Sequence, residues 1–388
     1  MKVAIIGAGP AGLAAAKNAS KMHDVVVFDG NNAAGKKLLL TGSGRCNIGN
    51  TNNDLSKYHS SNNELIPKII NDKNIDKVNN FFKEIGLVLK NKNGYLYPYS
   101  EKSASVLSCL KNSLHIDFRF NTYIENIKRN DDKFIINGEV FDKVIITTGG
   151  LSYPKTGSTG EGFHLAKKFG HKIIDLNPSL MALETNTGLE KELSGTRCEV
   201  NVSSYIDGRK IKEEHGELQL TSFGLSGICI FNLSRDIRLA LNEKKSCEVR
   251  INFCPWTDDL SKYMEENKDK SLTNICDGFL DYKLTNLFLK ILKIKDKKWC
   301  ELKIDEKIKF IDTLTNFKFS IEGTKGYLDA QVTSGGVSLE EINLETMESK
   351  LVKNLYFAGE VLDLDGDCGG YNLTISFITG LVAGDHHD

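Results

Sequence analysis

The hydrophobic and polar positions at the start of the chain predict a strand, a tight turn, a helix and a second strand. Residues 2–6 form a short apolar run typical of a buried strand, and the alanine-rich residues 13–20 are typical of a helix. Residues 25–28 form the next apolar run, which ends at Asp29. A short signal peptide is the alternative for residues 1–6, but the glycines that follow them favour a first strand. These elements together predict one βαβ unit.

The pattern changes after about residue 176, which predicts an insertion. Apolar residues alternate with others along residues 198–206, where Ser204 is the one polar member of the series, and again along 249–253, as in a half-buried antiparallel sheet or barrel. Helical periodicity follows, and a buried strand returns at residues 355–358. The expected domains are a first part of the main domain over 1–176, an inserted β-barrel-like domain over 177–255, a helical part of the insert over 256–317, and the rest of the main domain over 318–388.

Composition and charge narrow the class of protein. The chain has 388 residues, 40% hydrophobic and 26% charged, with a net charge of −1, which is ordinary for a globular protein of more than one domain. The charge balance offers no basic excess for a nucleic-acid backbone, and no apolar run is long enough to span a membrane. The nine cysteines form no CxxC pair and no metal-binding spacing. We therefore expect a cytoplasmic protein with reduced thiols that acts on a small molecule, and the oligomeric state stays open.

The glycines after the first strand have the spacing GxGxxG. In this position the first glycine permits a tight turn, the second permits a close approach of a pyrophosphate, and the third permits close packing of strand and helix. A carboxylate at the end of the second strand suits the ribose hydroxyls of a dinucleotide. The alternative is a tight turn that binds no ligand. The cofactor-binding residues expected here are Gly7, Gly9, Pro10, Ala11, Gly12, Asp29 and Gly30.

Two distant segments favour FAD over NAD as the dinucleotide. Residues 144–147 predict a strand that runs into three polar or glycine residues, and residues 356–358 predict a strand that runs into a glycine and a carboxylate. Such a carboxylate suits the ribityl hydroxyls of a flavin, and a glycine-rich helix start at residue 370 suits its pyrimidine edge. A second GxGxxG, typical of a separate NAD domain, is absent from the sequence. The residues expected to bind FAD here are Thr148, Gly149, Gly150, Gly359, Glu360, Gly370, Tyr371 and Asn372.

Three longer motifs resemble the signatures of the BaiN/aminoacetone-oxidase-like family of FAD-dependent flavoproteins. They are GKKLLLTGSGRCN at 35–47, GLSYPKTGSTGEG at 150–162, and AGEVLD at 358–363 with GGYN at 369–372. The resemblance implies an α/β fold with a split Rossmann-like FAD-binding domain, related to fumarate reductase and glutathione reductase, that carries an inserted antiparallel β-barrel and a small helical region. It also implies further cofactor-binding residues: Lys37, Gly44, Arg45, Cys46, Asn47, Ile124, Asp363 and Leu373.

The sequence identifies no catalytic acid, base or nucleophile with certainty, because the flavin carries the hydride chemistry. Cys46 and Cys368 are candidates for a redox dithiol, although two packing thiols explain them more simply. Tyr153 and Tyr371 are candidates for a proton donor or a ring stacked beside the flavin, with loop packing as the alternative. Arg45 suits a phosphate or the flavin O2 edge, and its alternative is a structural salt bridge.

Several functions fit these observations. The favoured one is an oxidoreductase that transfers hydride between FAD and a small organic substrate, reduced by NAD(P)H as a transient donor and acting on an enone-like or steroid-like acceptor. A flavin amine oxidase that uses O2 is the first alternative. Flavin-dependent RNA modification and a non-catalytic flavin-binding sensor are the others.

Overall fold

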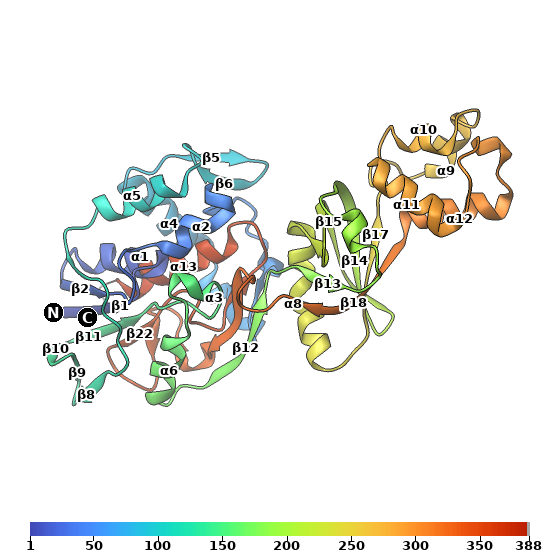
Figure 1. The fold of residues 1–388 in the computed structure, drawn as a ribbon. Coiled ribbons are helices and arrows are strands. Elements are labelled where there is room, and N and C mark those ends of the chain that lie inside the picture. Colours follow the sequence, from blue (N-terminus) through green and yellow to red (C-terminus); the bar gives the residue numbers. More distant parts are fainter. Residues whose placement is uncertain (386–388) are drawn as a thin grey trace. The chain divides into compact units, whose positions relative to one another are not determined.

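The computed structural model describes residues 1–385 and divides them into two compact units. One unit combines Met1–Pro178 with the chain from Ala330 onward, and the other is Ser179–Asp329. Figure 1 shows that the blue N-terminal and red C-terminal segments lie together in the first unit. The first unit is therefore built from both ends of the chain, as the sequence predicts.

A mainly parallel sheet forms the centre of the first unit. Its strand order is β20-β21-β22-β11-β1-β2-β7. The strands are β1 (Lys2–Ile6), β2 (Asp24–Phe28), β7 (Asp117–Arg119), β11 (Lys143–Ile146), β20 (Ile342–Asn343), β21 (Glu348–Ser349) and β22 (Leu355–Phe357). β1 lies parallel to β2 and β11, and β11 lies parallel to β22. The carboxyl ends of these four strands therefore meet at one edge, where ligands bind in such sheets.

Two helices from opposite ends of the chain pack against each other beside this sheet. They are α1 (Pro10–Ala19) and α13 (Tyr371–Ala383). A Cβ on Gly380 would overlap the carbonyl oxygen of Ala11, so the two backbones approach closely because α13 carries a glycine at the contact. This close packing, together with the β11–β22 pairing, joins the C-terminal segment to the N-terminal βαβ unit.

Shorter elements complete the first unit. Its other helices are α2 (Lys36–Leu40), α3 (Ile66–Ile69), α4 (Asp72–Glu84), α5 (Ser103–Asn112) and α6 (Glu161–Lys168). Its other strands are β3 (Gly49–Asn50), β4 (Tyr58–His59), β5 (Leu89–Lys92), β6 (Tyr95–Pro98), β8 (Lys128–Asn130), β9 (Lys133–Ile136), β10 (Glu139–Phe141), β12 (Ile173–Ser179), β19 (Val332–Val337) and β23 (Asp365–Gly366). β12 pairs with β19, and β23 pairs with β4.

The second unit contains a closed barrel, which confirms the predicted fold class. The barrel order is β13-β16-β15-β14-β17-β18. The strands are β13 (Leu183–Thr185), β14 (Arg197–Ile206), β15 (Arg209–Thr221), β16 (Gly224–Ser226), β17 (Cys247–Asn252) and β18 (Phe317–Thr324). β18 pairs with β13 and β17, so a strand that the sequence analysis assigned to the main domain closes the barrel instead.

Helices accompany the barrel within the second unit. They are α7 (Glu190–Leu193), α8 (Ile228–Asn242), α9 (Leu260–Glu266), α10 (Leu272–Cys276), α11 (Tyr282–Leu292) and α12 (Ile304–Thr315). α8 lies within the 177–255 segment expected to be a β-barrel-like domain, where no helix was predicted, and it buries Ile230, Leu233 and Ile237 in the core of this unit. Within residues 1–385, helices long and apolar enough to cross a membrane are absent.

Candidate functional site

The glycine-rich turn between β1 and α1 lines a cavity in the first unit. Gly7 has a φ of 108°, and a Cβ there would lie 2.6 Å from the carbonyl oxygen of Thr147. A Cβ on Gly12 would overlap the carbonyl oxygen of Gly7, so these two glycines let the strand and helix approach closely. A Cβ on Gly9, in contrast, would have no neighbour within 4 Å in the described part of the chain. The space in front of Gly9 is therefore open to a ligand.

Helix α1 presents its N-terminus to this open space. Its N-cap is Gly9, its first residue is Pro10, and its first turn is apolar. The first N–H groups of a helix have no partner within the helix, and the helix dipole adds a partial positive charge there. The turn is thus suited to bind a phosphate or diphosphate through its backbone.

Asp29 lies at the carboxyl end of β2 and faces the glycine turn. Its Oδ2 accepts a hydrogen bond from Ala8 N at 2.7 Å, and its Oδ1 accepts one from Asn31 N at 2.8 Å. A carboxylate oxygen accepts more than one hydrogen bond, so Asp29 holds the turn in place and keeps lone pairs available for ribose hydroxyls. Asn31 in turn donates from Nδ2 to Thr156 O at 3.0 Å, which ties the 156–159 loop to the end of β2.

The cavity brings together about half of the residues predicted to bind the cofactor. The predicted residues that line it are Gly7, Gly9, Pro10, Ala11, Asp29, Gly30, Lys37, Ile124, Thr148, Gly149, Gly359 and Glu360. The predicted residues outside this lining, as the described residues form it, are Gly12, Gly44, Arg45, Cys46, Asn47, Gly150, Asp363, Gly370, Tyr371, Asn372 and Leu373. Lining residues that the sequence analysis did not name include Asn31, Tyr123, Thr156, Ser158, Thr159, Glu161 and Ser376. Four of these lie within the motif at 150–162, so that motif was the sequence feature that could have identified them as cavity residues.

An ion pair crosses the wall of the cavity. Lys37 Nζ lies 2.6 Å from Glu360 Oε2, and both side chains are about four-fifths buried, at 23% and 18% exposed. Glu360 Oε1 also accepts a hydrogen bond from Thr333 N at 2.9 Å. The Glu360 carboxylate is therefore fixed at the carboxyl end of β22, where it faces the space beyond Gly359.

Thr333 of β19 organises this part of the site, although the sequence analysis did not identify it. It is 1% exposed, and its Oγ1 accepts hydrogen bonds from Leu151 N at 2.8 Å and Ser152 N at 3.1 Å. A Cβ on Gly150 would overlap Thr333 Oγ1 and lie 2.9 Å from Glu360 Oε1. Glycine at position 150 therefore lets the loop after β11 lie directly against Thr333 and Glu360.

Glu161, near Asp29, is the third carboxyl group that lines the cavity. Thr159 Oγ1 donates to Glu161 Oε1 at 2.8 Å, and Tyr123 lies next to the same carboxyl. Burial raises the pKa of Glu161, and the nearby charge of Asp29 raises it further, while the hydrogen bonds from Thr159 and Tyr123 act in the opposite direction. Because Ile124 also lines the cavity, this part of it offers both polar and apolar residues for an aromatic base.

Side-chain hydrogen bonds hold the loop before α13, both to its own backbone and to the segment at Ser61. Asn372 accepts from Gly366 N at 2.9 Å and donates to Gly366 O at 2.7 Å. Asp363 is 2% exposed and accepts from Ser61 N at 2.9 Å. Tyr371 is buried, and its ring meets that of Tyr58 edge to face at 5.2 Å between centroids. In the structure, Asn372 and Asp363 therefore hold the loop in shape.

The second part of the 35–47 motif, residues 41–47, is not part of the cavity lining that the described residues form, whereas Gly35, Lys36 and Lys37 are. Arg45 is exposed, and its charge acts on Tyr97, whereas Cys46 is completely buried. Burial raises the pKa of the Cys46 thiol to about 11, which keeps it protonated near neutral pH. The Asn47 amide lies within hydrogen-bonding distance of backbone atoms of Gly49 and Gly370, and so connects this loop to the start of α13.

The other two chemical candidates have local contacts as well. The Cys368 thiol is half-buried and lies 3.7 Å from Gln331 Oε1, and neither it nor Cys46 forms a disulfide within the described residues. Tyr153 is half-buried with a φ of 55° and precedes a short 3-10 turn. Neither residue lines the cavity that the described residues enclose.

The cavity fits FAD. The uncapped α1 terminus with open space at Gly9 suits the pyrophosphate, Asp29 and Glu161 suit the adenosine end, and Glu360 with Lys37 suits the ribityl side. When bound, FAD supplies a hydride-transferring ring that protein side chains do not provide.

Comparisons with known proteins agree with this reading. The chain is 33% identical over 400 residues to the 3-dehydro-bile acid delta(4,6)-reductase of Clostridium scindens, with 99% of this chain and 98% of that protein covered. It is 29% identical to the ribosomal RNA dihydrouridine synthase of Escherichia coli, with 95% and 93% covered. Among solved structures, the 3-ketosteroid delta1-dehydrogenase of Sterolibacterium denitrificans aligns with a TM-score of 0.51 at 10% identity over 98% of both chains, which shows a shared fold.

The family assignment rests on nearly the whole sequence. The family described as HI0933-like protein Rossmann domain matches residues 1–386. This match confirms the resemblance to BaiN-like flavoproteins, and the chain is an FAD-dependent oxidoreductase that belongs to the HI0933-like Rossmann family.

Proposed function

We propose that this protein is an NAD(P)H-fed reductase that saturates a carbon–carbon double bond conjugated with a carbonyl group. The observation that carries the proposal is the cradle for FAD formed by the α1 N-terminus, Asp29 and the Lys37–Glu360 pair. The names of two relatives narrow the acceptor. A delta(4,6)-reductase of a 3-dehydro bile acid and a dihydrouridine synthase both saturate a double bond that lies in conjugation with a carbonyl.

The chain's own residues bind and orient the cofactor. The backbone of the glycine turn and α1 neutralises the pyrophosphate charge, and Asp29 holds that turn through Ala8 N. Glu360 is kept in place by Thr333 N and Lys37 Nζ, so its carboxylate is positioned before the cofactor binds. FAD supplies the hydride for the double bond when it is bound.

Stopped-flow spectroscopy of the FAD-loaded protein tests this proposal in two stages. NADH or NADPH is mixed with the oxidised protein without oxygen, and bleaching of the flavin absorption is recorded. The reduced protein is then mixed with a 3-keto-4-ene bile acid or steroid, with its saturated counterpart as the control. Reoxidation by the unsaturated compound alone supports the proposal. Bleaching by an amine with peroxide release supports the amine oxidase, and a flavin that no donor bleaches favours the sensor.

A uracil base in RNA is the second candidate acceptor. It is favoured by the similarity to ribosomal RNA dihydrouridine synthases over 95% of this chain. The C5–C6 double bond of uracil is also conjugated with a carbonyl, so the same chemical step applies to it. Incubation of the reduced protein with ribosomal RNA, followed by mass analysis for dihydrouridine, distinguishes it from a small-molecule enone. This outcome would overturn our expectation that nucleic acid is not a partner.

A further inference from the structure

A buried histidine contacts the strand that leads into the FAD cavity. The His171 side chain lies just after α6 and is completely buried. Its Nδ1 lies 3.1 Å from Glu341 Oε2, and its Nε2 lies 2.8 Å from Oγ of Ser349, the last residue of β21. Its ring also meets the ring of Phe357, the last residue of β22, edge to face at 4.8 Å between centroids. His171 therefore contacts two neighbouring strands of the main sheet.

The hydrogen bonds of Ser349 determine which nitrogen of His171 carries the proton. Ser349 Oγ accepts hydrogen bonds from Leu351 N at 3.0 Å and Val352 N at 2.9 Å. A hydroxyl oxygen has two lone pairs, so both are occupied, and the hydroxyl donates its hydrogen to His171 Nε2. Nε2 is thus an acceptor, and Nδ1–H donates to Glu341. This arrangement requires a neutral ring with its proton on Nδ1.

A second proton, on Nε2, disrupts this arrangement. Nε2–H would point at an oxygen whose lone pairs already accept two backbone N–H groups, so one of these buried groups would lose its acceptor. Burial lowers the pKa of His171 from its ordinary value of 6.5, while the charge and the hydrogen bond of Glu341 act in the opposite direction. As the pH falls below that ordinary value, an opened turn binds a proton that the intact turn excludes, so the turn loses stability.

Glu341 is the charged group that acts on the His171 ring. Its Oε2 also accepts a hydrogen bond from Lys172 N at 2.8 Å, which holds the carboxylate in place. The other ionisable side chains on the segments around His171 are those of Lys168, Lys172, Glu340, Glu348, Lys350 and Tyr356.

The turn that Ser349 holds supports β22, which carries Glu360 into the cavity. β22 lies between β11 and β21 in the sheet, and it pairs antiparallel with β21. Phe357 N donates to O of Met347, just before β21, at 3.1 Å. Gly359 and Glu360 follow β22 and line the cavity. Loosening of β21 therefore removes one of the two neighbours of the strand that positions Glu360.

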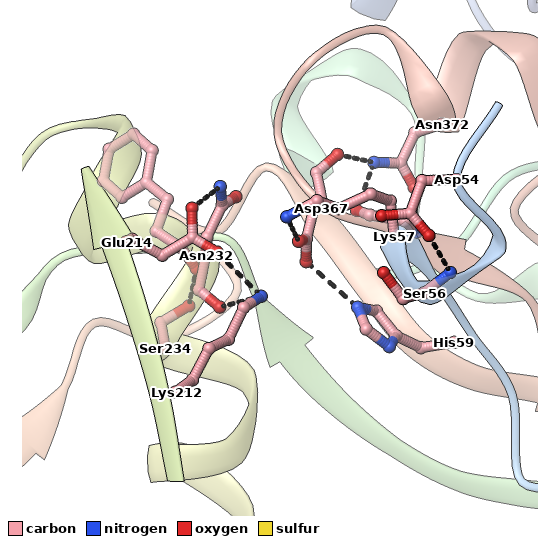
Figure 2. Close-up of polar contacts among 12 residues, drawn as sticks. Asp54, Ser56, Lys57, His59, Lys212, Glu214, Asn232, Ser234, Asp367 and Asn372 are labelled. Carbon is pink, nitrogen blue, oxygen red and sulfur yellow. Dashed lines mark hydrogen bonds and ion pairs between the residues drawn. The ribbon is translucent and has the colours of Figure 1, made fainter. Parts of the chain in front are cut away.

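His59, in the same unit, has a different arrangement (Figure 2). Its Nε2 lies 3.0 Å from Asp367 Oδ1, and its side chain is 22% exposed. This contact joins two side chains, so a charge on the His59 ring does not compete with a backbone hydrogen bond there. The contact of His171 with Ser349, in contrast, shares its oxygen with two backbone N–H groups. Of these two histidines, His171 is the one whose protonation affects the backbone of the sheet.

We infer that His171 is an acid-sensitive positioning residue of the cofactor site, and that FAD is released when its ring takes up a proton. The neutral ring holds the 349–352 turn, the turn holds β21 against β22, and β22 positions Glu360. The inference concerns the retention of FAD, so it does not depend on the acceptor that the reduced flavin uses. Because coupling between two sites is reciprocal, bound FAD must lower the proton affinity of His171 by the factor by which the proton weakens FAD binding.

NMR of the wild-type protein labelled with 15N-histidine tests this coupling without reference to how a variant folds. One neutral ring is expected to carry its proton on Nδ1, and its titration midpoint is expected to move to lower pH when FAD is added. The signal is assigned to His171 by its absence from His171→Gln. If no histidine combines the Nδ1–H tautomer with a midpoint that FAD lowers, the inference is overturned.

FAD titrations at a series of pH values provide the second measurement. The wild-type dissociation constant, from flavin fluorescence, is expected to rise by up to about tenfold per pH unit as the pH falls below the ordinary histidine value. His171→Gln is expected to lose this rise, because its side-chain oxygen can accept from Ser349 and takes up no proton. His115→Gln, which is exposed and outside the cavity lining of the described residues, is the matched control and is expected to keep the rise.

The comparison isolates His171 from the other ionisable groups of the cavity. Glu161, for example, titrates in all three proteins, so the difference between His171→Gln and the other two reports on His171 alone. A rise of the same size in wild type and His171→Gln overturns the inference and leaves the proposed reductase intact.

Discussion

Replacement of Thr333 by valine tests whether one buried hydroxyl holds the cofactor loop. Valine has nearly the same shape as threonine but carries no oxygen. Thr333 Oγ1 accepts two backbone N–H groups, from Leu151 and Ser152, and also bonds Ser152 Oγ at 3.0 Å. The substitution leaves these donors without their acceptor in a position that is 1% exposed.

The expected loss follows from the number of orphaned donors. A buried N–H without an acceptor costs about 1–3 kcal/mol, and a small shift of the loop or an entering water recovers part of this. Two such groups predict a loss of about 2–4 kcal/mol in the stability of the first unit. Since Gly150 lies between Thr333 and Glu360, FAD binding is expected to weaken in parallel.

The two tryptophans make the assay specific to each unit. Trp256 and Trp299 are the only two in the sequence, and both lie in the 179–329 unit. In a urea titration, tryptophan fluorescence therefore follows that unit, whereas flavin fluorescence follows release from the first unit. Thr333→Val is expected to lower the midpoint of flavin release and to leave the tryptophan midpoint unchanged.

Thr333→Ser is the matched control because it keeps the hydroxyl and removes only a methyl group. Its flavin-release midpoint is expected to lie much closer to wild type than that of Thr333→Val. Equal midpoints for wild type and Thr333→Val would refute the reasoning, and so would a fall of equal size in the two variants, because the loss would then come from packing.

Three further predictions concern other parts of the same unit. Gly9→Ala is expected to fold normally, because its Cβ has room in the described structure, and yet to lose FAD affinity. Gly12→Ala is expected to destabilise the fold itself, because its Cβ would overlap the carbonyl oxygen of Gly7. Calorimetry of the FAD-free proteins measures the loss of stability, and FAD titrations measure the loss of affinity. Burial raises the pKa of Glu161 above the unfolded-state value of 4.5, so the contribution of its protonated carboxyl to folding stability is fully present below that value and is lost as the pH rises through the folded-state pKa. Glu161→Gln is therefore expected to flatten this part of the pH–stability curve of the FAD-free protein. An unchanged slope would contradict the raised pKa of Glu161. Iodoacetamide at pH 8 is expected to label exposed Cys300 well before Cys46, whose pKa of about 11 and burial protect it, as peptide mass spectrometry would show.

Local sequence patterns predict the parts of the site that one short segment builds. The βαβ unit and the roles of Gly7, Gly9 and Gly12 follow from spacing, because strand, turn and helix are contiguous there. The sequence also contains a pattern that predicts helix α8, since Ile230, Leu233 and Ile237 follow a helical period within the segment assigned to the β-barrel.

Side-chain partners from distant segments could not be predicted in this way. Thr333 contacts the loop at Leu151 only because β19 and the end of β11 lie together in the folded unit, and no pattern near Thr333 in the sequence predicts that contact. The exposure of Arg45 is a similar case, because the left-handed residues Gly42 and Ser43 turn the loop, and a motif does not reveal where such a turn directs the next side chain.

The position of β22 in the sheet has a consequence for biosynthesis. β22 is the parallel neighbour of β11, yet the whole 179–329 unit lies between them in the chain. A ribosome therefore releases the complete barrel unit while β11 still has an open edge, and open strand edges promote aggregation. The nascent chain must keep that edge protected until β22 emerges, so chains truncated before Leu355 are expected to accumulate with chaperones or in inclusion bodies. For this protein, the cofactor domain is completed only after the barrel unit has been translated and β22 has followed it.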